Sequence, residues 1–172
     1  AVFAARQGGK VHLLEKNEKL GKKLFITGKG RCNLTNAADI GELFNAVVSN
    51  PKFLYSSFYS FTNDQTIDFF EELGVKTKVE RGGRVFPQSD HSSDVISALS
   101  RELSRLGVEV SLNTKVKELI VEEGRVTGVL LASGKKMVSD AVIVASGGIS
   151  YPSTGSTGDG YRFAKECGHK VT

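Results

Sequence analysis

Glu15 is the first residue of this sequence whose type and position point to ligand binding. It directly follows the short apolar run Val11–Leu14, which comes after the helix-ending pair Gly8 and Gly9. In a dinucleotide-binding βαβ unit, an acidic side chain ends the second strand about 20 residues after the glycine-rich turn. A carboxylate there accepts hydrogen bonds from both hydroxyls of a ribose. The alternative is a solvated acidic group at a strand end.

Residues 28–36 form a second candidate, with the composition of a ligand-binding loop. They read Gly-Lys-Gly-Arg-Cys-Asn-Leu-Thr-Asn. Glycines let a backbone approach a ligand closely. Arg31 can pair with a phosphate or stack on a flat ring, and the Asn33 amide can hydrogen-bond carbonyls and ring nitrogens. A turn-rich surface loop is the alternative.

Two more candidates are rich in glycine and lie near residue 150. Ser146-Gly147-Gly148 follows the apolar run 141–145, and ligands of open α/β sheets bind at the carboxyl ends of strands. Residues 150–161 are small, polar and aromatic, which suits a ligand loop better than a core. A tight turn and a flexible linker are the respective alternatives. Tyr151 and Tyr161 can either stack on a ring or pack.

The composition is that of an ordinary soluble globular domain, with 40% hydrophobic and 24% charged residues in a chain of 172. No run approaches the roughly 20 apolar residues of a membrane span. Cys32 and Cys167 have no metal-ligand spacing and form no disulfide framework, so we expect no metal and a reducing cytoplasm. The net charge of +4 is spread along the chain, which fits a solvated surface or a basic face for an anionic cofactor or RNA.

The elements that must position these candidates predict an α/β fold. We expect strands at Val11–Glu15 and Val108–Leu112, and a central parallel strand covered on both faces at Ala141–Ala145. The expected helices cover residues 1–6, 39–48, a segment from Pro51, one with Asn63 as N-cap and Gly74 after its end, one from Ser92 or Ser93 to Gly107, and 160–167.

This order predicts a doubly wound parallel sheet into which other elements are inserted. The helices of residues 37–106 form one insertion, and a three-stranded β-meander over 114–139 forms another. We expect residues 150–172 to lead toward a substrate domain. Because Ala1 lies in a helical pattern, we also expect preceding residues that include the first strand and the phosphate turn.

Four motifs resemble those of the BaiN/RdsA family of NAD(P)/FAD-dependent oxidoreductases, also known as the YhiN-like flavoproteins. They are Leu14–Asn17, Gly30–Asn36, Gly83–Pro87 and Ser150–Tyr161. The resemblance covers essentially the whole chain. The sequence departs from the family pattern at Ser146, where the family usually has Thr. The resemblance also suggests a chain truncated at both ends.

The resemblance implies a glutathione-reductase-like FAD-binding domain. FAD would be reduced by NAD(P)H and would pass hydride to an activated C=C or ring substrate, such as a bile-acid intermediate or a uridine of ribosomal RNA. Glu15 would hold the adenosine ribose, and the backbone of Val116 would meet the adenine. The implied cofactor-binding residues are Glu15, Lys16, Gly30, Arg31, Cys32, Asn33, Val116, Ala145, Ser146, Gly147 and Gly148.

Cys32 is the candidate proton donor, because a thiol beside Arg31 can have a lowered pKa. A packed cysteine that shapes the flavin pocket is the alternative. Two other functions stay open: a non-catalytic nucleotide- or RNA-binding module, and a fumarate-reductase-like flavoprotein. We expect a cytoplasmic enzyme, inactive as this chain alone. The substrate, the preferred nicotinamide and the oligomeric state are not predicted.

Overall fold

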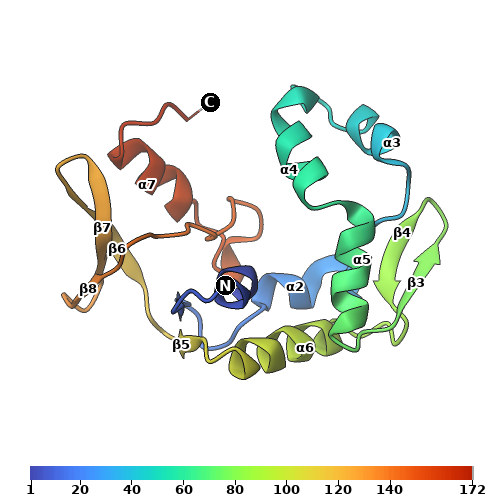
Figure 1. Cartoon of the computed structure of the whole chain (residues 1–172), viewed down its shortest axis with the longest axis horizontal. Helices are drawn as coiled ribbons and strands as arrows, with labels where there is room; N and C mark the ends of the chain where they lie inside the picture. Colours follow the sequence, from blue (N-terminus) through green and yellow to red (C-terminus); the bar gives the residue numbers. More distant parts are fainter. Residues whose placement is uncertain (172) are drawn as a thin grey trace. The chain divides into compact units, whose positions relative to one another are not determined.

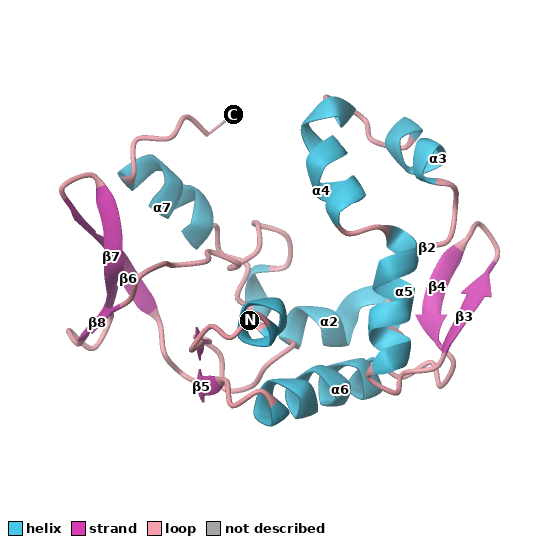
Figure 2. Ribbon diagram, viewed as in Figure 1, coloured by secondary structure: helices cyan, strands magenta, loops and turns pink. Residues whose placement is uncertain are grey.

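The computed structural model describes residues 1–171, which divide into two compact units (Figure 1). The first unit comprises residues 1–23 and 106–171, and the second comprises residues 24–105. Helix α2 (Lys22–Ile26) contains the boundary. Both units combine helices and short strands (Figure 2).

A two-stranded parallel sheet lies in the first unit. Strand β1 (His12–Leu14) pairs with β5 (Glu109–Ser111), and Leu13 lies opposite Val110. Helix α1 (Val2–Arg6) precedes β1, and Gly8 at φ +83° turns the chain after it. The predicted order of helix, glycine turn and strand is therefore confirmed.

A three-stranded antiparallel meander follows β5, as the sequence predicts. It contains β6 (Val116–Glu122), β7 (Arg125–Leu131) and β8 (Lys136–Val138) in that order. Glu123 and Gly124 both have positive φ, which is the conformation of a two-residue hairpin turn. Gly128 allows a close approach, because a Cβ there would collide with the backbone carbonyl oxygen of Met137.

The predicted central strand Ala141–Ala145 is wrong. The segment has no strand conformation, and Ile143 and Val144 are 75% and 44% exposed. An apolar run becomes a strand only when its N–H and C=O groups find a neighbouring strand. None of the strands in residues 1–171 pairs with this run. The chain continues through η3 (Pro152–Thr154) to α7 (Asp159–Glu166), close to the predicted helix.

The second unit is built around α6 (Ser92–Arg105), which begins at the predicted Ser92 and is followed by Gly107 at φ +68°. Val95 and Ala98 of this helix pack with Val75 and Cys32 in a buried apolar cluster. The unit's other elements are η1 (Thr27–Gly30), β2 (Thr35–Asn36), α3 (Ile40–Asn45), η2 (Pro51–Leu54), α4 (Tyr55–Ser60), α5 (Asn63–Glu72), β3 (Thr77–Glu80) and β4 (Arg84–Pro87).

The structure corrects two sequence predictions in this unit and adds one hairpin. Thr62, not Asn63, is the N-cap of α5, because its hydroxyl accepts from the Gln65 N–H while the Gln65 side chain accepts from the Thr62 N–H. Helix α3 ends at Asn45, three residues before the predicted Val48. The β3–β4 hairpin was not predicted, although its three-residue turn contains Gly82 and Gly83.

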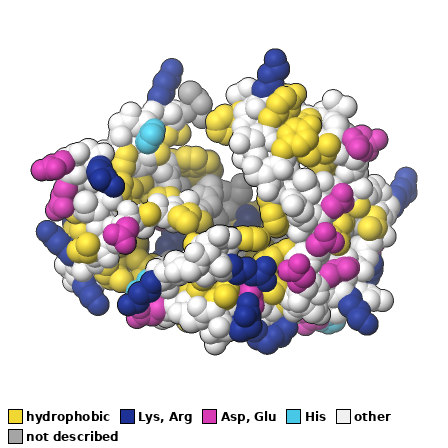
Figure 3. Space-filling view, viewed as in Figure 1, with side chains coloured by type: hydrophobic (Ala, Val, Ile, Leu, Met, Phe, Trp, Pro, Cys, Tyr) yellow, Lys and Arg dark blue, Asp and Glu magenta, His cyan; other side chains and the backbone are white. Residues whose placement is uncertain are grey.

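An aromatic cluster covers α3 and α4, where hydrophobic side chains gather on the surface (Figure 3). The ring of Phe44 is buried, with its centroid 4.5 Å from that of Tyr55 and 5.2 Å from that of Phe58. Tyr59 also packs on Phe44 but is 63% exposed. The aromatic residues of this cluster therefore gather here because they pack around the buried ring of Phe44.

Candidate functional site

Glu15 lies at the carboxyl end of β1, as the sequence predicts. Its N–H donates to the Ser111 carbonyl oxygen at 2.9 Å, which continues the β1–β5 pairing. Its Oε1 accepts from the N–H and from the side-chain amide of Asn17, both at 2.8 Å. Among residues 1–171, Oε2 has no hydrogen-bond partner, and the side chain is half-buried. The carboxylate is therefore held in place with one oxygen open to a ligand.

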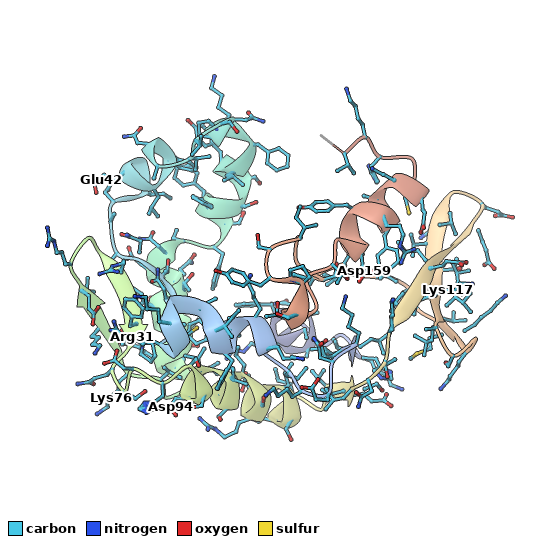
Figure 4. The ribbon with its side chains drawn as sticks, turned by 180° about the vertical axis from the view of Figure 1, so that it is seen from behind. Arg31, Glu42, Lys76, Asp94, Lys117 and Asp159 are labelled. Carbon is cyan, nitrogen blue, oxygen red and sulfur yellow. The ribbon has the colours of Figure 1, made fainter. Side chains whose placement is uncertain are left out.

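The two residues after Glu15 tie β1 to the loop of residues 150–159. Asn17 Nδ2 donates to the Thr154 carbonyl oxygen at 3.1 Å. Lys16 Nζ donates to Thr157 Oγ1 at 2.6 Å and to Asp159 Oδ2 at 2.7 Å. The hydrogen bond from Lys16 lowers the pKa of Asp159, against the opposing effect of burial. Asp159 lies at the start of α7 (Figure 4).

Gly147 and Gly148 pack against the same loop. Gly147 has φ +73°, and a Cβ on it would lie 3.2 Å from Ser156 Oγ. The Gly158 N–H donates to the Gly148 carbonyl oxygen at 3.1 Å. The structure thus brings together three of the four predicted segments in the first unit. Ala145 and Ser146 precede these glycines and are exposed.

Val116 begins β6 two residues after Thr114, whose N–H donates to the Glu15 carbonyl oxygen at 2.8 Å. A groove of about 600 Å³ lies beside this strand and shares Asp159 with the network around Lys16. Its lining consists of Lys115, Lys117, Glu118, Leu119, Ala132, Asp159, Arg162 and Glu166. Of its basic residues, only Lys115 forms no ion pair with the described residues.

The positive charge of the chain is concentrated in the first unit, which corrects the even distribution inferred from the sequence. Residues 1–23 and 106–172 contain 14 Lys and Arg against 9 Asp and Glu. Residues 24–105 contain 9 against 10. An anionic ligand is therefore attracted to the unit that holds Glu15 and the glycine-rich loops.

The fourth predicted segment lies in the second unit and contains Arg31, which is labelled in Figure 4. Arg31 is the centre of an ion-pair network. Its Nε donates to Asp90 Oδ1 at 2.7 Å, and its Nη2 also pairs with Glu80. Its Cζ lies 4.1 Å from the ring centroid of Phe86. Lys78 Nζ pairs with Asp90 Oδ2 at 2.6 Å. The guanidinium thus already has two carboxylates and an aromatic ring as partners.

The backbone of this loop is unusual as well. Gly28, Lys29, Gly30 and Cys32 all have φ between +56° and +87°. In the orientation that satisfies both amide atoms, Asn33 donates to the carbonyl oxygens of Val85 and Thr35. Left-handed non-glycine residues persist only where surrounding contacts fix them, and they are frequent at ligand sites. That this loop and Glu15 bind the same ligand stays a prediction.

Cys32 does not have the lowered pKa that was inferred from its neighbour Arg31. Its side chain is 1% exposed and packs with Val75, Val95 and Ala98. Burial raises the pKa of the thiol, although a hydrogen bond with Thr27 opposes the shift. These contacts favour the packed cysteine, while the proton-donor role stays a prediction.

The two cysteines are expected to react with a thiol reagent at very different rates. Both are free, but Cys32 is buried and Cys167 is exposed. Because a thiol must be accessible to be alkylated, Cys167 should react in the folded protein and Cys32 only after denaturation. Mass spectrometry of the native protein after alkylation checks this. Equal labelling of both cysteines would contradict the buried position of Cys32.

Several residues of the network were not singled out from the sequence. Asn17 is two residues from Glu15, so its hydrogen bond to the Glu15 carboxylate could have been predicted as a local side-chain-to-backbone contact. Glu80 and Asp90 lie 49 and 59 residues from Arg31, and no local pattern links them. Within the described part of the chain, no group of three or more His, Cys, Asp or Glu is suited to hold a metal ion. None of its helices is long and apolar enough to cross a bilayer.

Three curated relatives match nearly all of this chain. It is 37% identical over 174 residues to the 3-dehydro-bile acid delta(4,6)-reductase of Clostridium scindens, which covers 100% of this chain and 41% of the relative. It is 27% and 28% identical to the ribosomal RNA dihydrouridine synthases of Haemophilus influenzae and Escherichia coli, over 99% of this chain and 42% of each relative. The chain thus spans about two fifths of these proteins.

Solved structures share the fold. A flavocytochrome c3 fumarate reductase matches with a TM-score of 0.65 and 21% identity over 96% of this chain and 37% of that chain. L-proline dehydrogenase from P. horikoshii matches with a TM-score of 0.55 and 15% identity, over 99% and 52%. At these identities the likeness establishes a Rossmann-like α/β fold, which confirms the predicted fold class.

The family model described as the HI0933-like protein Rossmann domain matches residues 1–172. This match and the relatives confirm the resemblance that the four sequence motifs indicate. The chain therefore belongs to the HI0933-like family, whose Rossmann domain it matches along its whole length.

Proposed function

We propose that this chain is the FAD-binding part of an NAD(P)H-dependent oxidoreductase that reduces a C=C bond in a ring substrate. One observation carries the proposal: the Glu15 carboxylate ends a parallel strand with Oε2 without a partner among the described residues. Its neighbour Asn17 is bonded to the loop of residues 150–159, and Gly147 and Gly148 pack against that loop. This is the arrangement that a Rossmann-like fold uses to hold the ribose of a dinucleotide. When bound, FAD supplies the hydride transfer.

The described residues fit such a cofactor. Among residues 1–171, Glu15 Oε2 has no donor, and the ribose hydroxyls are donors. Gly147 leaves space that a side chain would fill beside Ser156. The first unit has an excess of basic residues, and Lys115 in its groove has no ion-pair partner in the described part of the chain. Both features suit the two phosphates of a dinucleotide.

Each residue of the site has a definite task in this proposal. Glu15 binds and orients the ribose, and Asn17 fixes the rotamer of Glu15 through its two hydrogen bonds. Lys16 holds the loop of residues 150–159 through Thr157 and Asp159. The loop in turn excludes water from the bound nucleotide. Lys16 acts through these two partners, because its ammonium is already bonded to both.

Arg31 has a positioning task rather than a direct contact with phosphate. Its guanidinium is bonded to Glu80 and Asp90, so a phosphate would compete with two carboxylates. The network anchors Arg31, which lies between residues of positive φ, Gly30 and Cys32. We propose that this loop presents its backbone to the flavin.

The names of the relatives support a reduction as the reaction class. One is a delta(4,6)-reductase of a bile acid, and two are synthases of dihydrouridine in ribosomal RNA. Both descriptions concern loss of a C=C bond in a ring. We propose the same reaction class here, with NAD(P)H as electron donor and the cytoplasm as compartment. The two free cysteines are consistent with a reducing compartment.

Spectra of the complete purified protein test this proposal. We expect a yellow protein whose flavin absorbance bleaches when NADH or NADPH is added without oxygen. Bound flavin that neither nucleotide bleaches would favour a non-catalytic nucleotide-binding module or a fumarate-reductase-like flavoprotein. Protein that binds RNA but no flavin, even after incubation with FAD, would contradict the proposal.

A further inference from the structure

Tyr151 has a backbone conformation that is unusual for a large side chain. Its φ is +56°, and it is the one aromatic residue with positive φ in the described part of the chain. Bulky L-residues rarely adopt this left-handed region, because Cβ approaches the following carbonyl oxygen. Where a chain needs only a left-handed turn, glycine adopts it without this strain.

Hydrogen bonds on both sides hold Tyr151 in this conformation. Its carbonyl oxygen accepts from the Thr154 N–H at 2.9 Å and from Thr154 Oγ1 at 2.8 Å. The preceding carbonyl, of Ser150, accepts from Lys23 Nζ at 3.1 Å. Thr154 is itself bonded to Asn17, which fixes Glu15. Tyr151 is therefore connected through two residues, Thr154 and Asn17, to the proposed ribose-binding carboxylate.

The side chain of Tyr151 gains little packing in return for this strain. The residue is 65% exposed. Lys23 Nζ lies 4.3 Å from the ring centroid and covers one face of the ring. Ile149, two residues earlier, is 67% exposed as well. A fixed aromatic ring with one face covered by a cation and little other contact is suited to stack on a planar ligand.

We propose that the ring of Tyr151 stacks on the isoalloxazine ring of the FAD, and that Lys23 positions it. This inference rests on the proposed function, and it assigns a residue that the proposal leaves without a task. In the proposed function, Glu15 binds the ribose at the adenosine end of the cofactor. FAD has two planar ring systems, and the isoalloxazine is the one that is not at the adenosine end. It is therefore the ring that we assign to Tyr151.

Fluorescence and affinity together test the inference in the complete protein reconstituted with FAD. A tyrosine in contact with a flavin quenches its fluorescence, whereas a phenylalanine of the same shape does not. Tyr151→Phe should therefore raise the fluorescence of the bound flavin while leaving its affinity unchanged. Tyr151→Ala should raise the fluorescence and also weaken FAD binding by about tenfold, because the stacked ring is lost.

Tyr59→Phe is the matched control, because Tyr59 is 63% exposed but packs against Phe44. It should change neither readout. Wild-type protein that binds FAD and fluoresces as strongly as Tyr151→Phe would overturn the inference while leaving the proposed function intact. Wild-type protein that binds no FAD would overturn the proposed function itself. The phenylalanine variant keeps the ring, so a folding defect of Tyr151→Ala does not prevent the test.

Discussion

Replacing Glu15 by glutamine is expected to weaken FAD binding by about 10- to 100-fold, the range of a lost hydrogen bond to a charged group. Glutamine keeps one oxygen for the two hydrogen bonds from Asn17, so the end of β1 should stay folded. The second oxygen becomes an amide that donates, and it then faces the ribose hydroxyls as a poorer partner. Titration of the apoprotein with FAD, followed by absorbance, measures the change.

Glu18→Gln is the control for this substitution. Glu18 lies three residues further along, is exposed and pairs with Lys22, so the variant makes the same change of charge in the same segment. We expect its FAD affinity to equal that of the wild type. An equal loss of affinity in both variants would mean that overall charge, and not a contact of Glu15, determines binding.

Gly155→Ala is expected to destabilise the loop by about 1–3 kcal/mol, the cost of a non-glycine residue in a left-handed conformation. Gly155 has φ +99°, and a Cβ there would lie 2.7 Å from Asn17 Nδ2 and 3.1 Å from Lys16 Cε. The new methyl group therefore displaces the side chain of Asn17, and Glu15 loses the hydrogen bond from the Asn17 amide. FAD affinity should fall together with the free energy of unfolding.

Gly134→Ala separates the backbone strain from the collision with Asn17. Gly134 has φ +87°, but a Cβ there would have no atom within 4 Å. This variant should lose a similar amount of stability and keep its FAD affinity. Urea unfolding and FAD titration of both variants give the comparison. If Gly155→Ala binds FAD as tightly as Gly134→Ala, then Asn17 does not control the position of Glu15.

Local signals in the sequence were sufficient for most elements of the fold. The apolar spacing of Val95, Ile96, Leu99 and Leu103 predicts α6, since one face of the helix must be buried. Glycines with positive φ mark the ends of α1, α5 and α6 and the turns of the meander. These elements depend on residues that are neighbours in the chain, so their prediction needs no tertiary information.

The incorrect predictions concern features that depend on contacts between residues far apart in the sequence. Residues 141–145 have the composition of a buried strand, but a strand also needs neighbours, and the described chain supplies none. The lowered pKa expected for Cys32 assumed an exposed thiol beside a free Arg31. Long-range contacts instead bury the thiol and pair the guanidinium with Glu80 and Asp90.

The candidate site was predictable in part. A carboxylate after an apolar run and loops rich in glycine identify Glu15, Gly147 and the segment 150–161 as candidates. The bonds that connect them, from Lys16 and Asn17 to residues more than 130 positions away, follow only from the folded chain. The sequence therefore indicated which residues could bind a ligand, and the structure added the hydrogen bonds that fix their positions.

A crystal structure of the complete protein with FAD bound tests the central claim most directly. We expect a carboxylate oxygen of Glu15 within hydrogen-bond distance of the adenosine ribose hydroxyls, with Arg31 and Gly147 beside the same cofactor. FAD bound elsewhere, with Glu15 facing only solvent and the two glycine-bearing loops on separate surfaces, would contradict the account.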